Sequence, residues 1–167
     1  MGKPQPINLQ VERVIDAPPE VIYDLVSDVT RIGEWSPECI EASWLDGATQ
    51  PAVGVRFKGV NQLGFAKWST KPTITEAERG KAFAFKVPGK VGPLWRYEFH
   101  QHADGTRVVE SMSQDAPLNL FIRFLQRRNG VTDRAAHLAD GMHTTLDRLA
   151  AAATSTNPTQ STATVRA

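Results

Sequence analysis

The spacing of hydrophobic residues changes three times along the chain, and each change marks a boundary between predicted elements. Residues 7–15 alternate apolar and polar side chains, which is the period of a half-buried strand. Residues 17–29 carry an apolar stripe at helical spacing behind two prolines and Glu20, which suit a first helical turn. A second short helix or turn should end at Ser36-Pro37, because the residue before a proline is driven out of the helical region.

From Cys39 the period becomes two, which predicts six further strands separated by connectors rich in Gly, Pro and Asp. After Pro117 the helical period returns, from Leu118 to about Ala153. This helix has a possible break at Asn129-Gly130, after which Thr132 or Asp133 would cap its second part. The six expected strands are residues 39–45, 54–60, 66–78, 81–87, 94–101 and 106–114.

This order of elements predicts an α+β fold. Short connections between successive strands imply an antiparallel meander, and one face of such a sheet must be covered. We therefore expect residues 1–153 to form a single domain, in which a curved seven-stranded antiparallel sheet wraps on the long C-terminal helix, with two short helices after the first strand. Residues 154–167 are expected to be a disordered tail, because they contain too little apolar surface to offset the entropy of ordering.

The alternation within each strand also predicts which side chains point inward. Trp95, Tyr97 and Phe99 share one face of their strand, and this aromatic face must be the inner one. Pairing across the loop at residues 102–105 then places Glu110 inside, opposite Tyr97. A slip of one residue would bury Val109 and two serines in its place, and we prefer the first register.

Large aromatic side chains recur on the inner face of strand after strand, with a few polar groups among them. Such a lining is the usual form of a small-molecule site, although a solid aromatic core is the alternative. The predicted lining residues are Phe57, Asn61, Trp68, Phe85, Trp95, Tyr97, Phe99, Glu110 and Met112 from the strands and Phe124, Leu138 and Met142 from the C-terminal helix.

Several short sequence motifs occur along the chain in the same order as in the START / birch-pollen-allergen superfamily (SRPBCC), which this chain therefore resembles. That superfamily has the helix-grip fold. The resemblance is strongest to its bacterial "polyketide cyclase/dehydrase and lipid transport" branch and spans about residues 7–150. It implies an internal cavity between sheet and helix that holds an apolar ligand, but no single reaction, since the superfamily includes carriers, sensors and cyclases. The motifs are IDAPPEVIYDLVSDV (15–29), GEWSPEC (33–39), VGVRFKG (53–59), FAFKV with LWRYEF, DGTRVVES (104–111) and DGMHTTLDRL (140–149), together with Trp68.

The GEWSPEC motif contains the only cysteine and could be read as a catalytic centre. A nucleophilic cysteine needs a base or positive charge beside it, whereas Cys39 follows Glu38, whose charge would raise the thiol pKa. Trp35 lies where the family's second short helix closes one end of the cavity, so a lining role is plausible for it. We therefore interpret this segment, called the corner below, as part of the wall of the predicted cavity and not as a catalytic centre.

Three residues are candidates for acid–base chemistry, namely Glu110, Tyr97 and Arg13. If the first and last strands pair, as in the family, Arg13 could approach Glu110 across the sheet and form a buried ion pair. Alternatively, Glu110 in an apolar cavity could have a raised pKa and, with Tyr97, move protons during an aldol cyclisation or dehydration. The sequence thus favours a carrier or sensor of a lipid, polyketide-like or aromatic compound, with a cyclase, aromatase or dehydratase and a ligand-free interaction module as alternatives.

Composition and charge argue against nucleic-acid binding, membrane association, secretion and metal binding. The hydrophobic fraction of 41% and the net charge of +1 fit a soluble protein with no nucleic-acid partner and no stable membrane association. The start of the chain lacks the apolar region of a signal peptide, so we expect a cytoplasmic protein. The four histidines, the single cysteine and the carboxylates show no zinc spacing, and we expect neither a metal nor another cofactor.

Overall fold

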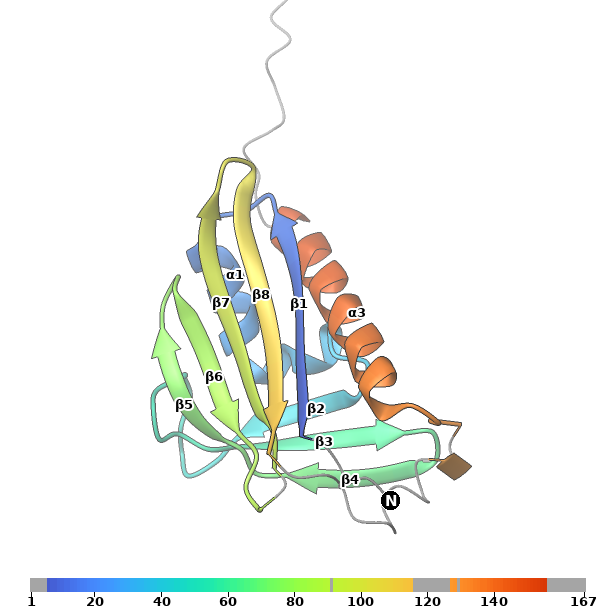
Figure 1. Ribbon diagram of the computed structural model, residues 1–167. Coiled ribbons are helices and arrows are strands. Elements are labelled where there is room, and N and C mark those ends of the chain that lie inside the picture. The colour runs from blue at the N-terminus through green and yellow to red at the C-terminus, as the bar shows by residue number, and fades with distance from the viewer. Residues whose placement is uncertain (1–5, 91, 116–126, 129, 156–167) are drawn as a thin grey trace, which may run out of the picture.

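The computed structural model describes residues 6–90, 92–115, 127–128 and 130–155. Its described strands form two antiparallel sheets (Figure 1). The larger sheet has five strands in the order β1-β8-β7-β6-β5, and the smaller has three in the order β2-β3-β4. The strands are β1 (Ile7–Ile15), β2 (Cys39–Trp44), β3 (Phe57–Leu63), β4 (Ala66–Thr70), β5 (Thr73–Glu78), β6 (Ala82–Lys86), β7 (Leu94–His102) and β8 (Gly105–Gln114).

The predicted single sheet of seven strands is therefore wrong, because the structure describes eight strands in two sheets. The segment 66–78, expected to be one strand, is divided at Lys71-Pro72 into β4 and β5, which belong to different sheets. Proline cannot donate to a strand ladder, and the chain turns there from one sheet into the other. The two sheets stay connected through an isolated bridge between Arg56 and Thr73 and through the Ile74 amide, which donates to the Val55 carbonyl.

Helix α1 (Pro19–Ser27) follows β1, as the two prolines and the apolar stripe predicted. The second short element, expected as a helix or turn, is the 3-10 helix η1 (Val29–Glu34). The long helix α3 spans Arg134–Ser155. The Asp133 side chain accepts a hydrogen bond from the Ala136 amide at 3.1 Å, so Asp133 caps α3 as one of the two expected residues. The first part of the predicted C-terminal helix began at Leu118. Its residues 118–126 lie outside the described residues.

The C-terminal boundary differs slightly from the prediction. Helix α3 includes Thr154 and Ser155, the first two residues of the expected tail, and their hydroxyls donate to helix carbonyls one turn back. Residues 156–167 lie outside the described residues, so the tail stays a prediction.

The core lies between the five-stranded sheet and the two helices α1 and α3, which cover one face of that sheet (Figure 1). Helix α3 packs along β1 and α1, while the three-stranded sheet crosses the lower end of the molecule in this view. The fully buried centre is mainly aliphatic, with two aromatic rings. It includes Ile15, Ile22, Phe57, Ile74, Phe83, Val108, Met112, Met142, Leu146 and Leu149.

The preferred register of the last hairpin is confirmed. Gln101 pairs with Thr106, and Tyr97 pairs with Glu110, so both of the latter side chains point to the helix-covered face. Strand β1 pairs antiparallel with β8 and places Val11 opposite Glu110 on the other side. A carboxyl group is thus built into the middle of the inner face.

Candidate functional site

Glu110 is the most unusual residue of the interior, because a carboxyl group is rarely this deeply buried without a charged partner. Its exposed fraction is 2%, and it lies on β8 between Tyr97 of β7 and Val11 of β1. The Tyr97 hydroxyl donates a hydrogen bond to Glu110 Oε1 at 2.8 Å. The second oxygen, Oε2, is buried and has no hydrogen-bond partner among the described residues.

This environment changes the protonation of both groups. Burial raises the pKa of Glu110 to about 8, and the hydrogen bond from Tyr97 opposes that rise only in part. Burial, together with the neighbouring Glu110, raises the pKa of Tyr97 well above its ordinary value. At neutral pH the pair therefore consists mainly of a carboxylic acid and a phenol. A neutral carboxylic acid can donate a hydrogen bond, which a carboxylate cannot.

Arg13 is not the partner of Glu110, and that prediction is wrong. The two strands do pair, but Arg13 faces Val108, and its guanidinium forms an ion pair with Asp147 of α3. Both side chains of that pair are largely exposed. A long arginine side chain on an edge strand can extend to the solvent boundary, where its charge avoids the cost of burial.

The interior near Tyr97 also contains the thiol of Cys39. A Cβ added at Gly59 would meet Cys39 Sγ at 3.3 Å and Thr70 Oγ1 at 3.5 Å, so this glycine makes room for both groups. Burial raises the pKa of Cys39 to about 11, and Glu38 adds to the effect. The thiol is therefore protonated at neutral pH, which argues against a nucleophile and agrees with the interpretation from the sequence.

Sequence reasoning missed Cys39 as a neighbour of Tyr97. A signal was available, because Phe57 and Asn61 were predicted to point inward and Cys39 begins the adjacent strand. The pairing of Cys39 with Asn61 across β2 and β3 then brings the thiol inward beside Gly59. Only the crossing of the two sheets brings this group near Tyr97.

Most of the other predicted lining residues are inside, but they are not all equivalent. Trp68 lies on the inner side of β4 by register, yet its exposed fraction is 39%, because it is near the far end of the small sheet. Phe124 lies outside the described residues. Asn61 and Trp95 are half-buried, while Trp35, Phe57, Phe85, Phe99, Met112, Leu138 and Met142 are buried.

Part of the aromatic set forms ordinary core. Tyr23 of α1, which sequence reasoning did not select, packs edge-on against Phe83 and Phe99 with ring centroids 6.2 and 6.0 Å apart. Phe57 packs in the same manner against Phe85 at 5.2 Å. These contacts account for the four phenylalanines by packing alone, whereas the Tyr97 hydroxyl donates a hydrogen bond to a buried carboxyl group.

The corner at residues 33–39 is fastened to α3. The Arg134 guanidinium donates two hydrogen bonds of 2.6 Å to the Glu38 carboxylate, and both side chains are mostly buried. Arg148 Nη1 donates to the Trp35 carbonyl at 3.4 Å. A Cβ at Gly141 would meet Pro37 at 3.4 Å, so the helix approaches the turn closely. The corner closes one end of the interior, with Trp35 2% exposed.

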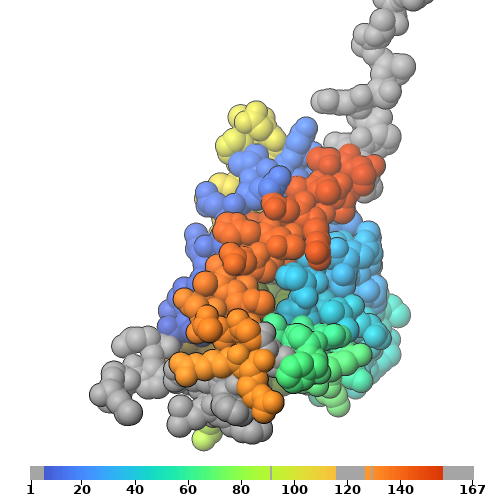
Figure 2. Space-filling model, turned by 90° about the vertical axis from the view of Figure 1, so that its right-hand side faces the viewer, coloured from blue at the N-terminus to red at the C-terminus, as the bar shows by residue number. Residues whose placement is uncertain are grey.

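In Figure 2 a small hollow lies between α3, coloured orange, and the segments coloured cyan and green. These colours correspond to the region of η1 and β2 and to the β3–β4 hairpin. The hollow lies where α3 meets the corner and the small sheet.

Two further features bear on chemistry. Within the described residues, no group of three or more His, Cys, Asp or Glu side chains could hold a metal ion. None of the described helices is both long and apolar enough to cross a membrane.

Comparison with known proteins agrees with this architecture. The model of the family "Polyketide cyclase / dehydrase and lipid transport" matches residues 6–154. The chain belongs to this family. The resemblance inferred from the sequence motifs is thereby confirmed. The α+β fold with a curved antiparallel sheet and a C-terminal helix agrees with this family. No curated protein matches the chain in sequence.

Several solved structures share the fold of this family member. The Polyketide_cyc-like protein Cgl2372 from Corynebacterium glutamicum is 26% identical, with a TM-score of 0.61, and the match covers 96% of this chain and 99% of that one. Major latex-like protein 151 from Panax ginseng is 14% identical, with a TM-score of 0.65 and coverage of 90% and 99%. The di-domain aromatase/cyclase StfQ of the steffimycin biosynthetic pathway is 12% identical, with a TM-score of 0.69. The match covers 91% of this chain and 52% of StfQ.

Proposed function

We propose that this family member binds an apolar small molecule that carries a neutral hydrogen-bonding group, such as a hydroxyl or a ketone. The molecule would lie between the inner face of the sheet and α3, and the protein would act as a carrier or sensor. The observation that supports this most directly is Glu110 Oε2, a buried polar atom with no hydrogen-bond partner among the residues that the structure describes. An unsatisfied buried polar group costs about 1–3 kcal/mol, and a ligand that satisfies it would recover that free energy.

The protonation of Glu110 narrows the class of ligand. With a pKa of about 8 the group is mainly a carboxylic acid at neutral pH, so it offers a donor to a carbonyl or hydroxyl oxygen. The Tyr97 hydroxyl holds the other oxygen and keeps the carboxyl plane oriented. The surrounding aromatic and aliphatic side chains would contact the apolar remainder of the molecule.

A reaction is the second candidate, and one observation favours it. A carboxyl group with a pKa near 8, hydrogen-bonded to a tyrosine, is suited to give and take a proton near neutral pH. StfQ, a structural neighbour, is named as an aromatase/cyclase. An aldol cyclisation or a dehydration of a poly-ketone would use such a pair. The protein would then turn over its ligand and not merely hold it.

Native mass spectrometry of the purified protein tests binding first, since a co-purified apolar molecule would appear as an added mass. A fluorescent apolar probe, displaced by a lipid extract, provides the quantitative assay. The Glu110→Gln variant retains the shape and an acceptor for Tyr97 but lacks the acidic proton. Its amide NH2 can still donate to the ligand, so we expect it to bind ketone- or hydroxyl-bearing ligands as the wild type does. Glu110→Leu, which has no donor, should bind these ligands about tenfold more weakly and a pure hydrocarbon probe equally well.

The Glu110→Gln variant separates the candidates. If a poly-ketone is converted by the wild type and not by Glu110→Gln, although both bind it, the protein is an enzyme. If neither converts it and both bind, the protein is a carrier or sensor. Failure of every apolar probe to bind, with no added mass, would leave an interaction module without a ligand and would refute the proposal.

A further inference from the structure

The hairpin of β3 and β4 presents a large aromatic side chain to solvent. Phe65 lies in its turn with an exposed fraction of 78%, the highest of the exposed large hydrophobic residues. Trp68, three residues later, is 39% exposed. The hairpin, coloured green, reaches the face of the molecule shown in Figure 2, beside the first turns of α3. Single exposed hydrophobic residues are common, but an exposed Phe in a turn followed by an exposed Trp on the next strand calls for an explanation.

Exposure rises steadily along the hairpin from the core to its end. Phe57 at the start of β3 is buried against Phe85, and Gly59 further along is also buried. The pair of Asn61 and Trp68 is partly exposed, and Phe65 lies almost wholly in water. The inner apolar side of the small sheet therefore continues out of the core onto the surface, and it ends there without a described covering element.

The charged residues of this region are all basic. Residues 47–75 contain none of the 18 acidic residues of the chain and four of its 19 basic ones. Of these four, Arg56 forms an ion pair with Asp46. Lys58, Lys67 and Lys71 are exposed, and none is paired with a described carboxylate. The nearest acidic residue by strand pairing is Glu41 of β2, which lies opposite Val60 and outside the hairpin.

We propose that the β3–β4 hairpin docks reversibly on an anionic phospholipid bilayer. Phe65 and Trp68 would enter the headgroup region, where aromatic side chains are favoured, and the three lysines would lie over the lipid phosphates. Neither signal is strong enough alone, but an apolar insertion and a basic patch together give measurable binding. The docking is a transient surface contact, in keeping with the expectation of no stable membrane association, and it does not depend on the interior ligand.

A bilayer fits this surface better than other partners. Phe65 lies in the turn, which is the end of the hairpin, and Lys67 and Trp68 follow it on β4. Lys58 and Lys71 lie at the other end of the two strands. That arrangement matches the depth order of a bilayer, in which an apolar layer lies beneath a negatively charged surface. A protein interface would need a broader apolar area than one turn provides.

Vesicle sedimentation tests the docking with the full chain. We expect the wild type to bind vesicles of phosphatidylcholine and phosphatidylglycerol at a ratio of about 3:1 much more tightly than vesicles of phosphatidylcholine alone, with binding that weakens as salt rises. Loss of the three hairpin lysines should weaken binding about tenfold, and so should Phe65→Ser. The lysine variant is Lys58→Gln/Lys67→Gln/Lys71→Gln.

Two matched controls isolate the hairpin. Lys81→Gln/Lys86→Gln/Lys90→Gln removes the same charge from another part of the chain, and Val14→Ser removes an exposed hydrophobic residue from the outer face of β1. Neither should change vesicle binding. All of the substituted side chains are exposed or half-exposed, and unchanged thermal melts will show that the variants fold.

Tryptophan fluorescence gives an independent readout. On vesicle binding the emission should shift to shorter wavelength in the wild type, and Trp68→Phe should abolish that shift, because Trp35, Trp44 and Trp95 are buried or half-buried. Equal losses in the hairpin and control lysine variants would overturn the proposal. So would a Phe65-dependent dimer without vesicle binding, or lysine-dependent binding of a single-stranded oligonucleotide in place of vesicles.

Discussion

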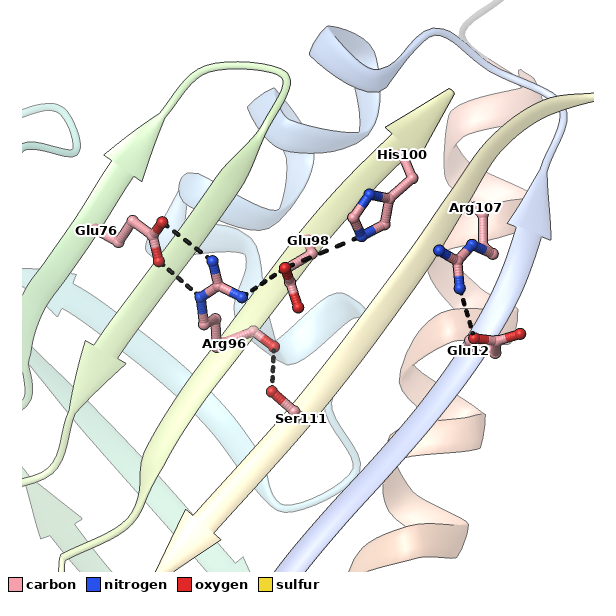
Figure 3. A network of polar contacts seen from close by, with 7 residues as sticks. All are labelled: Glu12, Glu76, Arg96, Glu98, His100, Arg107 and Ser111. Carbon is pink, nitrogen blue, oxygen red and sulfur yellow. Dashed lines mark hydrogen bonds and ion pairs between the residues drawn. The ribbon is translucent and has the colours of Figure 1, made fainter. Parts of the chain in front are cut away.

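Carboxyl groups on the two faces of the β7–β8 hairpin lie in opposite environments. On the inner face Glu110 is buried beside the Tyr97 phenol, with no counter-ion in the described part of the chain, and its pKa is raised. On the outer face Arg96 lies between two carboxylates, Glu76 at 2.7 Å and Glu98 at 2.6 Å (Figure 3). Arg96 lowers the pKa of Glu76. The same sheet thus contains Glu110, whose pKa is raised on the inner face, and Glu76 of β5, whose pKa is lowered on the outer face.

On the outer face of the sheet, long charged side chains cover small apolar residues, and no described helix lies over this face. Val109 is buried there between Glu12 and Glu98, and Ala84 is buried between Glu76 and Arg96. The aliphatic stems of the long charged side chains shield these small apolar residues, while the charged ends pair in water. Mixed pairs of this kind stabilise a surface locally and need no ligand. The lone inner carboxyl group has no such compensation, and this contrast identifies it as the candidate site.

The largest expected difference between the faces is in the dependence of stability on pH. The folded-state pKa of Glu110 is raised from 4.5 to about 8, so folding favours its protonated form. Its contribution is full below pH 4.5 and is lost as the pH rises through 8. Over that window the wild type should lose roughly 3–5 kcal/mol relative to Glu110→Gln, which cannot ionise. Denaturant melts of both proteins between pH 5 and 9 measure this, and parallel profiles would contradict it.

Removal of the single partner on the inner face should have the next largest effect. Tyr97→Phe leaves both Glu110 oxygens unsatisfied and should lower the free energy of unfolding by about 1–3 kcal/mol. It should also raise the pKa of Glu110 further, because the lost hydrogen bond lowers it. The double variant Tyr97→Phe/Glu110→Leu should recover most of the loss. A thermodynamic cycle from denaturant melts tests the coupling, and strictly additive losses would show that the pair is not coupled.

Outside, Arg96→Leu should have a smaller effect of opposite pH dependence. The guanidinium lowers the pKa of Glu76, so this contribution is present above the ordinary carboxyl pKa and is lost as the pH falls through the lowered one. We expect a loss of about 0.5–1 kcal/mol at pH 7, because the pair is partly exposed. The loss should shrink in acid. Melts at pH 7 and pH 3 measure both values, and a loss that grows in acid would contradict the assignment.

The smallest effect is expected at Arg13. Its ion pair with Asp147 is exposed, so Arg13→Leu should change stability by about 0.5 kcal/mol or less. The same variant should leave the pH profile of Glu110 unchanged. A shift in that profile, measured with the same melts from pH 5 to 9, would mean that Arg13 acts on Glu110 after all and would weaken the contrast between the two faces.

Much of the fold could be predicted from the sequence because alternation is a local property. The change of period located β1, α1 and the later strands to within a few residues. The hairpin turn and the aromatic face of β7 then determined which residue lies opposite Tyr97. The position of Glu110 inside was therefore predictable. The break at Lys71-Pro72 was visible as a proline, but the sequence pattern alone did not show that the chain would leave one sheet and enter another there.

By itself the sequence determined which side chains face inward, because successive residues of a strand point to opposite faces whatever lies around them. It did not determine their partners. Arg13 could extend to either Glu110 or Asp147, and only the position of α3 beside β1 decided for Asp147. In the same way, the crossing of the small sheet brought Cys39 toward Tyr97 and carried Trp68 out to the surface. Contacts between elements depend on how whole sheets and helices pack, and that is a property of the tertiary structure.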